Sequence, residues 1–287
     1  MRSLPDVVDR LCEISTRAYQ NPYEAVEWPE AIAPADLCMS PELVSLYGTP
    51  VWEGLSAEQR TRLAFHEAIN FFSLNIHGEK ALIEGLAARL YAPRLASVSK
   101  YIHHFLDEEN KHMVWFGTFC TRYARGPYPE KKMRLAGAEL SLAEEDFLFF
   151  LKVAVFEELV DVYNARMAKD DRLVPVARRI NFLHHQDEMR HLAFGRLLVQ
   201  SLFEELRPTW SADKLEAMRT YAADYLRATW REYYNPDVYR DAGLAEPYRV
   251  YKAALASETT RGHRRAISGQ SLRWLREIDV FEQEPSL

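Results

Sequence analysis

The stretch His184-His185-Gln186-Asp187-Glu188-Met189-Arg190-His191 decides how the chain folds and what it can bind. In a helix, His184 lies four residues before Glu188, and His191 lies three residues after it. Side chains at these offsets stand on one face of the helix, one turn apart. Two imidazoles and a carboxylate therefore converge, which is a ligand set suited to a transition metal that accepts both nitrogen and oxygen. His185 is an alternative to His184, and a solvated helix face rich in His and Glu is the alternative to a metal site.

The composition limits the class of protein. The chain has 287 residues, 48% of them hydrophobic, and a formal net charge of −6. This length allows a large core in one domain, and the negative charge argues against a nucleic-acid partner. The three cysteines are far apart, so they are expected to be reduced thiols in a cytoplasmic protein. The most apolar run, residues 147–156, is too short to span a bilayer and contains Lys152, so no membrane partner is expected.

Long helical patterns predict the architecture. Four helices of similar length are expected at about 56–91, 95–123, 142–169 and 173–206. A short helix at 3–19 and a proline-rich wrap at 21–54 precede them, and helices at 211–234, 247–258 and 263–278 follow. No run of residues predicts a series of strands. We therefore expect an all-α single domain over 1–287: an N-terminal helix and wrap (1–55), a four-helix bundle (56–206) and flanking C-terminal helices (207–287).

Each of the four long helices carries a glutamate on its apolar face. These residues are Glu79, Glu109, Glu188 and, on the third helix, either Glu157 or Glu158, between which periodicity does not choose. An unpaired buried carboxylate costs several kcal/mol, whereas a whole domain is stable by only about 5–15 kcal/mol. Two divalent ions would balance four glutamates that lie beside neutral histidines. A buried polar network without metal is the alternative.

Two of these glutamates belong to Glu-x-x-His pairs, Glu109 with His112 and Glu188 with His191. One Glu from each of two helices and one Glu-x-x-His from each of the other two is the arrangement of di-iron and di-manganese carboxylate bundles. The repeated pair therefore predicts a dinuclear metal site. A ligating histidine usually donates its second ring N–H to a carboxylate. Asp187 and Glu108, which each precede a ligand glutamate, are expected to accept these bonds from the facing helix.

The bundle region, residues 56–206, resembles the ferritin-like di-iron N-oxygenases, the family whose best-known member oxidises p-aminobenzoate. The family carries a third histidine one turn before the last Glu-x-x-His, and His184 matches it. The segment 154–157 resembles the third-helix ligand segment and selects Glu157 over Glu158. The segments 109–112 and 78–83 resemble the ligand regions of the second and first helices. The resemblance implies seven metal ligands and no further catalytic residue: Glu79, Glu109, His112, Glu157, His184, Glu188 and His191.

The resemblance implies a non-haem di-iron monooxygenase of natural-product biosynthesis. Such an enzyme activates O2, its co-substrate, and oxidises a primary amine to the hydroxylamine, nitroso or nitro level. Two Fe ions are the expected cofactor, with Mn as an alternative because both metals accept His and carboxylate ligands. No flavin or nicotinamide fingerprint is present, so the expected partners are a small-molecule amine and an external electron donor or reductase. A homodimer is one assembly that fits.

Two other functions stay open at this point. One is C–H oxidation, by a di-iron hydroxylase or desaturase. The other is a ferritin-like metal-binding or storage protein, which predicts that no substrate pocket lies beside the metals. Tyr163 and Asn164, which follow Glu157 on the third helix, are expected to line such a pocket.

Overall fold

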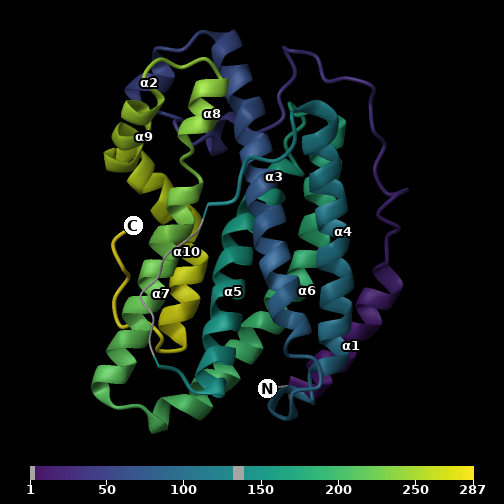
Figure 1. Cartoon of the computed structure of the whole chain (residues 1–287), viewed down its shortest axis with the longest axis vertical. Coiled ribbons are helices and arrows are strands. Elements are labelled where there is room, and N and C mark those ends of the chain that lie inside the picture. Colours follow the sequence, from purple (N-terminus) through teal and green to yellow (C-terminus); the bar gives the residue numbers. More distant parts are fainter. Residues whose placement is uncertain (1–3, 132–138) are drawn as a thin grey trace.

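A bundle of four long helices forms the centre of the computed structural model, which describes residues 4–131 and 139–287 (Figure 1). The bundle helices are α3 (Ala57–Ala87), α4 (Ser99–Tyr123), α5 (Leu142–Met167) and α6 (Pro175–Leu206). The most extensive contacts join α5 to α6 and α3 to α4. Among the described residues the only β-type pairing is an isolated bridge between Leu37 and Leu173. The prediction of an all-α, ferritin-like bundle is confirmed.

Local signals explain where most of the long helices begin. The side chains of Ser56 and Ser141 each accept a hydrogen bond from the backbone N–H three residues on. In turn, the side chains of Gln59 and Glu144 accept a hydrogen bond from the backbone N–H of the capping serine. These two capping boxes fix the first turns of α3 and α5. Helix α4 begins at Ser99, later than predicted, because Pro93–Leu95 forms a separate 3-10 turn. A proline at its first position starts α6.

Two glycines of α3 make room for aromatic side chains of α5. A Cβ atom added at Gly78 would lie 2.5 Å from the ring of Phe156, and one added at Gly85 would overlap the ring of Phe149. Real Cβ atoms do not come this near to a ring, so both phenylalanines depend on a bare backbone opposite them. The two rings therefore fill part of the space between α3 and α5.

The remaining helices cover the bundle on two sides. Helix α1 (Leu4–Ala18) packs on α4 and α6, and α7 (Ala212–Glu232) and α10 (Glu258–Glu277) pack on α5. At one end, α8 (Pro236–Asp241) contacts α3 and α9 (Pro247–Ala256), near the short α2 (Pro50–Glu53) (Figure 1). The indole of Trp115 donates a 2.9 Å hydrogen bond to the carbonyl of Pro22, which ties the N-terminal wrap to α4. None of the described helices is long and apolar enough to cross a membrane.

Candidate metal centre

The seven residues predicted as ligands lie together in the middle of the bundle, and none is more than 2% exposed. They form three overlapping groups, in each of which the possible ligand atoms lie within 4.8 Å of one another. The groups are Glu79 with His112 and His184, Glu109 with Glu188 and His191, and Glu157 with His184 and Glu188. The third group shares one residue with each of the other two. The arrangement therefore offers two adjacent positions for cations.

The structure also separates the candidates that the sequence left as pairs. His184 directs Nε2 at Glu79 Oε1 (3.1 Å) and at Glu188 Oε1 (3.2 Å). His185 instead turns outward and contacts Asp161. On α5, Glu157 faces the cluster, whereas Glu158 faces away from it and contacts Arg196 of α6 and Ser271 of α10.

Unpartnered oxygen atoms show that the cluster needs cations. Each of its four glutamates has one buried carboxylate oxygen that accepts no hydrogen bond from the described residues: Glu79 Oε2, Glu109 Oε1, Glu157 Oε2 and Glu188 Oε2. Of these, Glu109 Oε1 lies 2.9 Å from Nδ1 of His191, the nitrogen that faces the cluster. An unpaired buried charge of this kind costs several kcal/mol. Carboxylate oxygens and imidazole nitrogens are the donors that iron and manganese accept. These residues are thus suitable ligands for a pair of metal ions.

Without metal, the electrostatics of the cluster oppose the ionised form of two of its glutamates. Burial raises the pKa of Glu79 and of Glu157 well above the usual range, and the neighbouring Glu109 and Glu188 raise both further. A bound cation would remove this penalty. Burial lowers the pKa of His184 well below its usual value, and the nearby His112 adds to the effect. His184 is therefore neutral, which is the state in which an imidazole can ligate a metal.

A second layer of acids orients two of the histidines, as predicted. His112 Nε2 lies 3.2 Å from Asp187 Oδ2, and His191 Nε2 lies 2.8 Å from Glu108 Oε2. Because Nε2–H donates to these carboxylates, Nδ1 of each ring is left facing the cluster. Burial tends to raise the pKa of Glu108, but its hydrogen bond to His191 and the nearby charges lower it to about 2. Glu108 is thus a permanent anion behind the ring.

Two buried cations that were not predicted complete this layer. Arg190 contacts both Glu108 and Asp187, and Lys111 Nζ lies 3.1 Å from Asp187 Oδ2. Helical spacing could have indicated only one of these contacts, since Arg190 follows Asp187 by three residues. These contacts hold the two acids in place. In addition, the side chain of Asn164 contacts Nδ1 of His184, which leaves Nε2 directed at the cluster.

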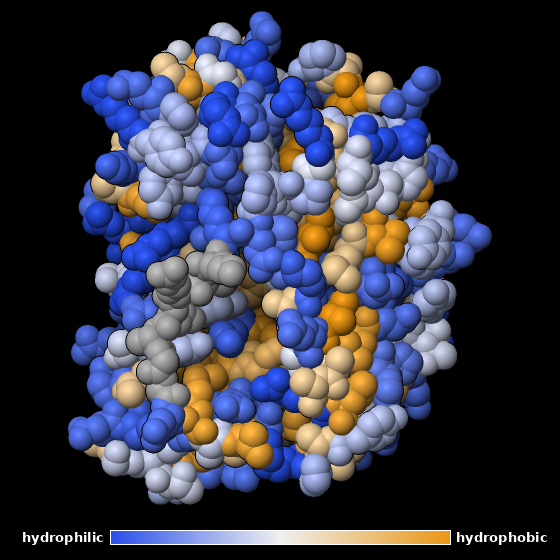
Figure 2. Space-filling view, viewed as in Figure 1, coloured by the Kyte–Doolittle hydropathy of each residue, from blue (hydrophilic) through white to orange (hydrophobic). Residues whose placement is uncertain are grey.

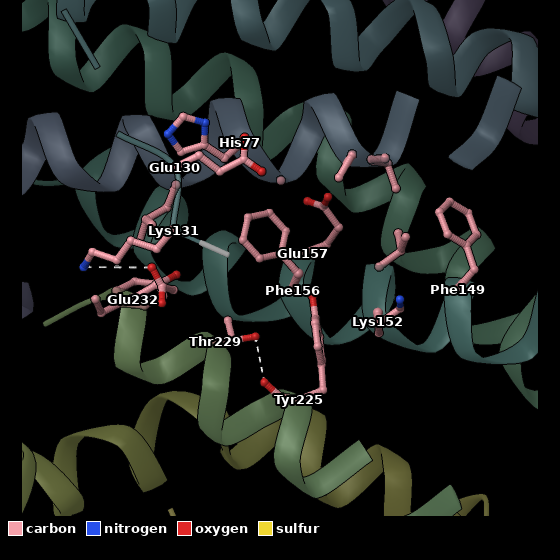
Figure 3. A pocket seen from close by; sticks show the side chains of 16 residues that line it. His77, Glu130, Lys131, Phe149, Lys152, Phe156, Glu157, Tyr225, Thr229 and Glu232 are labelled. Atoms are coloured by element: carbon pink, nitrogen blue, oxygen red, sulfur yellow. Dashed lines mark hydrogen bonds and ion pairs between the residues drawn. The ribbon is translucent and has the colours of Figure 1, made fainter. Parts of the chain in front are cut away.

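A cavity of about 480 Å³ lies between α3, α5 and α7, and Glu157 is the residue of the cluster that lines it. Figure 2 shows this side of the molecule hollowed below the middle, with apolar side chains gathered around the hollow. In Figure 3 the Glu157 carboxylate points toward α3, with the Phe156 ring beside it. The prediction that Tyr163 and Asn164 line the pocket is wrong. Neither lines this cavity: the Tyr163 hydroxyl lies 3.2 Å from His263, and Asn164 contacts His184.

Comparisons with known proteins agree with this geometry. The sequence matches the family model of the p-aminobenzoate N-oxygenase AurF over residues 2–279. Two solved structures of single-site mutants of an R2-like ligand-binding oxidase, each with an anaerobically reconstituted Mn/Fe cofactor, share the fold. Their TM-scores are both 0.52, at 15% and 16% identity, and the match covers 96% of this chain and 94% of each of theirs. No curated protein sequence matches significantly. Because the family model spans nearly the whole chain, the protein belongs to the p-aminobenzoate N-oxygenase family of O2-dependent di-iron oxidoreductases.

Proposed function

We propose that this protein uses its buried cluster as a di-iron centre to oxidise the nitrogen of a small primary amine. The ligands would be the seven residues that converge in the bundle: Glu79, Glu109, His112, Glu157, His184, Glu188 and His191. One observation carries the proposal. Four buried glutamates with unpartnered oxygens lie beside three histidines, and one of them opens onto a cavity large enough for a small molecule.

The metals would supply the reduction and activation of O2, and the protein would supply position and a dry environment. Asp187 and Glu108 hold two of the histidine rings through their Nε2 atoms. The ring of Phe105 stacks on His191 at a centroid distance of 3.9 Å, and that of Phe116 lies 5.0 Å from His184. Such apolar cover excludes water from the centre. The electrons would come from an external donor or reductase.

The walls of the cavity indicate what kind of amine would fit. Leu74, Phe149 and Phe156 supply apolar surface, which suits an aromatic body. Lys152 also lines the cavity, and burial, helped by the nearby Arg89, lowers its pKa. No acidic side chain in the described parts of the chain forms an ion pair with Lys152, so an anionic group on the substrate would be favoured there.

The spacing of Lys152 and Glu157 suits a short aromatic acid. They are five residues apart on α5, which corresponds to a rise of about 7.5 Å along the helix. Figure 3 places Lys152 toward one end of the cavity, whereas His77, Glu130, Lys131 and Glu232 gather at the other end. An aromatic amine with a carboxylate opposite the nitrogen, such as p-aminobenzoate, is therefore the first substrate to test.

The test is to load the purified protein with Fe(II), supply a reductant and O2, and follow a panel of amines by mass spectrometry. We expect two irons per chain and N-oxidised products. p-Aminobenzoate should be a better substrate than its neutral amide, and Lys152→Met should remove that preference. Iron binding and O2 consumption without oxidation of any amine would count against N-oxygenation. A hydroxylated or desaturated carbon product would favour C–H oxidation, and a many-subunit cage would favour storage.

A further inference from the structure

Tyr233 has a hydroxyl group that the fold itself does not use. The residue follows the last turn of α7, lines the cavity beside Glu157 and is 6% exposed. Its hydroxyl oxygen is buried and has no hydrogen-bond partner among the described residues. Leaving a buried hydroxyl unpaired is unfavourable, so a phenylalanine would serve the packing at least as well. The hydroxyl therefore indicates a partner that enters the cavity.

Neighbouring tyrosines do not share this property. The hydroxyl of Tyr163 lies 3.2 Å from His263 Nε2, that of Tyr234 accepts a 3.0 Å bond from Arg264, and that of Tyr239 lies 2.8 Å from Ser45 Oγ. Each of these groups is satisfied within the protein. Tyr233 differs from them in lining the cavity.

The Tyr233 ring is held in one orientation. Its centroid lies 5.2 Å from that of Tyr163, 5.0 Å from that of Trp230 and 6.4 Å from that of Phe71. Rings packed at these distances on several sides leave little freedom to rotate. Burial raises the pKa of Tyr233, and the charge of Glu157 raises it further. The hydroxyl is therefore a protonated group of fixed orientation in the cavity that Glu157 also lines.

We propose that Tyr233 positions the amine by accepting a hydrogen bond from one of its N–H groups. This inference rests on the proposed function, because it assigns the group that the cavity offers to the reacting nitrogen. A nitrogen that takes up oxygen must direct its lone pair at the metal centre. A neighbour that accepts an N–H bond holds the nitrogen without occupying that lone pair. Tyr233 is thus a residue that selects amines over isosteric groups without an N–H.

Binding measurements on the full-length protein test this without turnover. Mn(II)-loaded wild type, Tyr233→Phe and Tyr163→Phe are titrated calorimetrically in the absence of O2 with p-aminobenzoate and with p-methylbenzoate. The second ligand replaces the amine by a methyl group of similar size. Wild type should prefer the amine, and Tyr233→Phe should reduce that preference by about fivefold to tenfold. Tyr163→Phe, which removes a hydroxyl already bonded within the protein, should keep the wild-type preference.

The outcomes separate this inference from the proposed function. An unchanged amine preference in Tyr233→Phe, or a wild type that does not distinguish or does not bind the two ligands, overturns the role of Tyr233. Oxidation of amines is measured separately on Fe(II)-loaded wild type with O2. If the preference for the amine depends on Tyr233 but no amine is oxidised, the inference stands and the proposed function fails. Metal content and melting temperature of each variant confirm that a lost preference is not a lost fold.

Discussion

Helix α3 buries two glutamates, Glu67 and Glu79, whose surroundings differ. Glu67 is isolated: Ser45 donates a hydrogen bond to it, and no other acid in the described parts of the chain lies in contact with it. Burial raises its pKa to about 8, so it is mainly protonated at neutral pH. Glu79 is equally buried but lies among other acids, with Glu109 and Glu188 raising its pKa beyond the effect of burial. One proton neutralises the first residue, whereas the second belongs to a group of four.

The difference shows why burial alone does not identify a metal site. A single buried carboxylic acid can remain neutral by keeping its proton, and Ser45 gives Glu67 a hydrogen-bond partner inside the protein. The cluster holds carboxylates whose second oxygens have no such partner. Its nearest neighbours are imidazoles that present ring nitrogens to the acids. A metal ion satisfies both kinds of donor at once, which protons cannot do.

Glu157→Gln should have the largest effect and should separate function from stability. Loss of a ligand should reduce amine oxidation by more than the roughly 100-fold that a supporting residue usually contributes. The metal-free protein, however, should become more stable at neutral pH. On folding, wild-type Glu157 must either bury a charge beside Glu188 and Glu109 or take up a proton, and glutamine does neither. The measurements are metal content, turnover and the melting temperature with and without metal.

Glu158→Gln is the matched control for that experiment. Glu158 is the next residue on α5 but pairs with Arg196 outside the cluster, so its substitution should leave two metals per chain. If Glu157→Gln kept full metal content and activity, Glu157 would not be a metal ligand. The contrast between the cluster and the Glu67 site would then be wrong.

Asp187→Asn should have the next largest effect. The change weakens the bond that orients His112 and removes the negative charge beside Lys111. Metal affinity should fall by about 10–100-fold, and leaving a buried cation unpaired should also lower stability. Competition with a chelator measures the affinity. Asp161→Asn, which weakens the partly buried pair with His185 outside the cluster, should leave the metal affinity unchanged. Equal affinities for the two variants would show that the acids behind the histidines do not support the centre.

Glu67→Gln should change how stability depends on pH but should not change the metal content. Below about pH 4.5 the acid is protonated in the folded and unfolded states alike. Between pH 4.5 and about 8 the unfolded chain ionises while the folded state keeps its proton, so wild-type stability falls as pH rises. Glutamine does not titrate in this range, so the variant lacks this loss of stability. The variant's free energy of unfolding should therefore increase relative to wild type across this range, by up to about 5 kcal/mol. Urea unfolding at several pH values measures this difference, and a constant difference would contradict the assignment.

Local signals made most of the fold predictable. The bundle helices end within a few residues of the predicted bounds because serine caps, prolines and apolar periodicity all lie within the helices or beside them. The late start of α4 was missed, because a 3-10 turn and a helix look alike over three residues. The short α2 and α8 were missed because elements of four to six residues carry too little periodicity.

The candidate site was predictable where its residues share helical spacing. Glu109 with His112 and Glu188 with His191 are local pairs, so the sequence alone displays them. The cavity differs, because α7 brings Tyr233 beside Glu157 from a distant part of the chain. No spacing rule relates residues on different helices. For the same reason Tyr163 and Asn164 were expected in the cavity, where tertiary packing places other side chains.

Ser45→Ala should have the smallest effect, and it tests whether the Ser45 hydroxyl sets the pKa of Glu67. The hydroxyl of Ser45 bonds to Glu67 and lies 2.8 Å from that of Tyr239, so its removal should cost about 1 kcal/mol. Because this hydrogen bond lowers the pKa of Glu67 against the effect of burial, that pKa should move upward. The fall in stability with pH should then extend to more alkaline conditions, with metal content unchanged.

Unfolding curves measured up to pH 9 test this prediction. If stability stopped falling at the same pH in the variant and in wild type, solvent rather than Ser45 would determine the charge of Glu67. A shift would show that one neutral hydrogen bond tunes an isolated buried acid, a means of control that the four acids of the cluster lack.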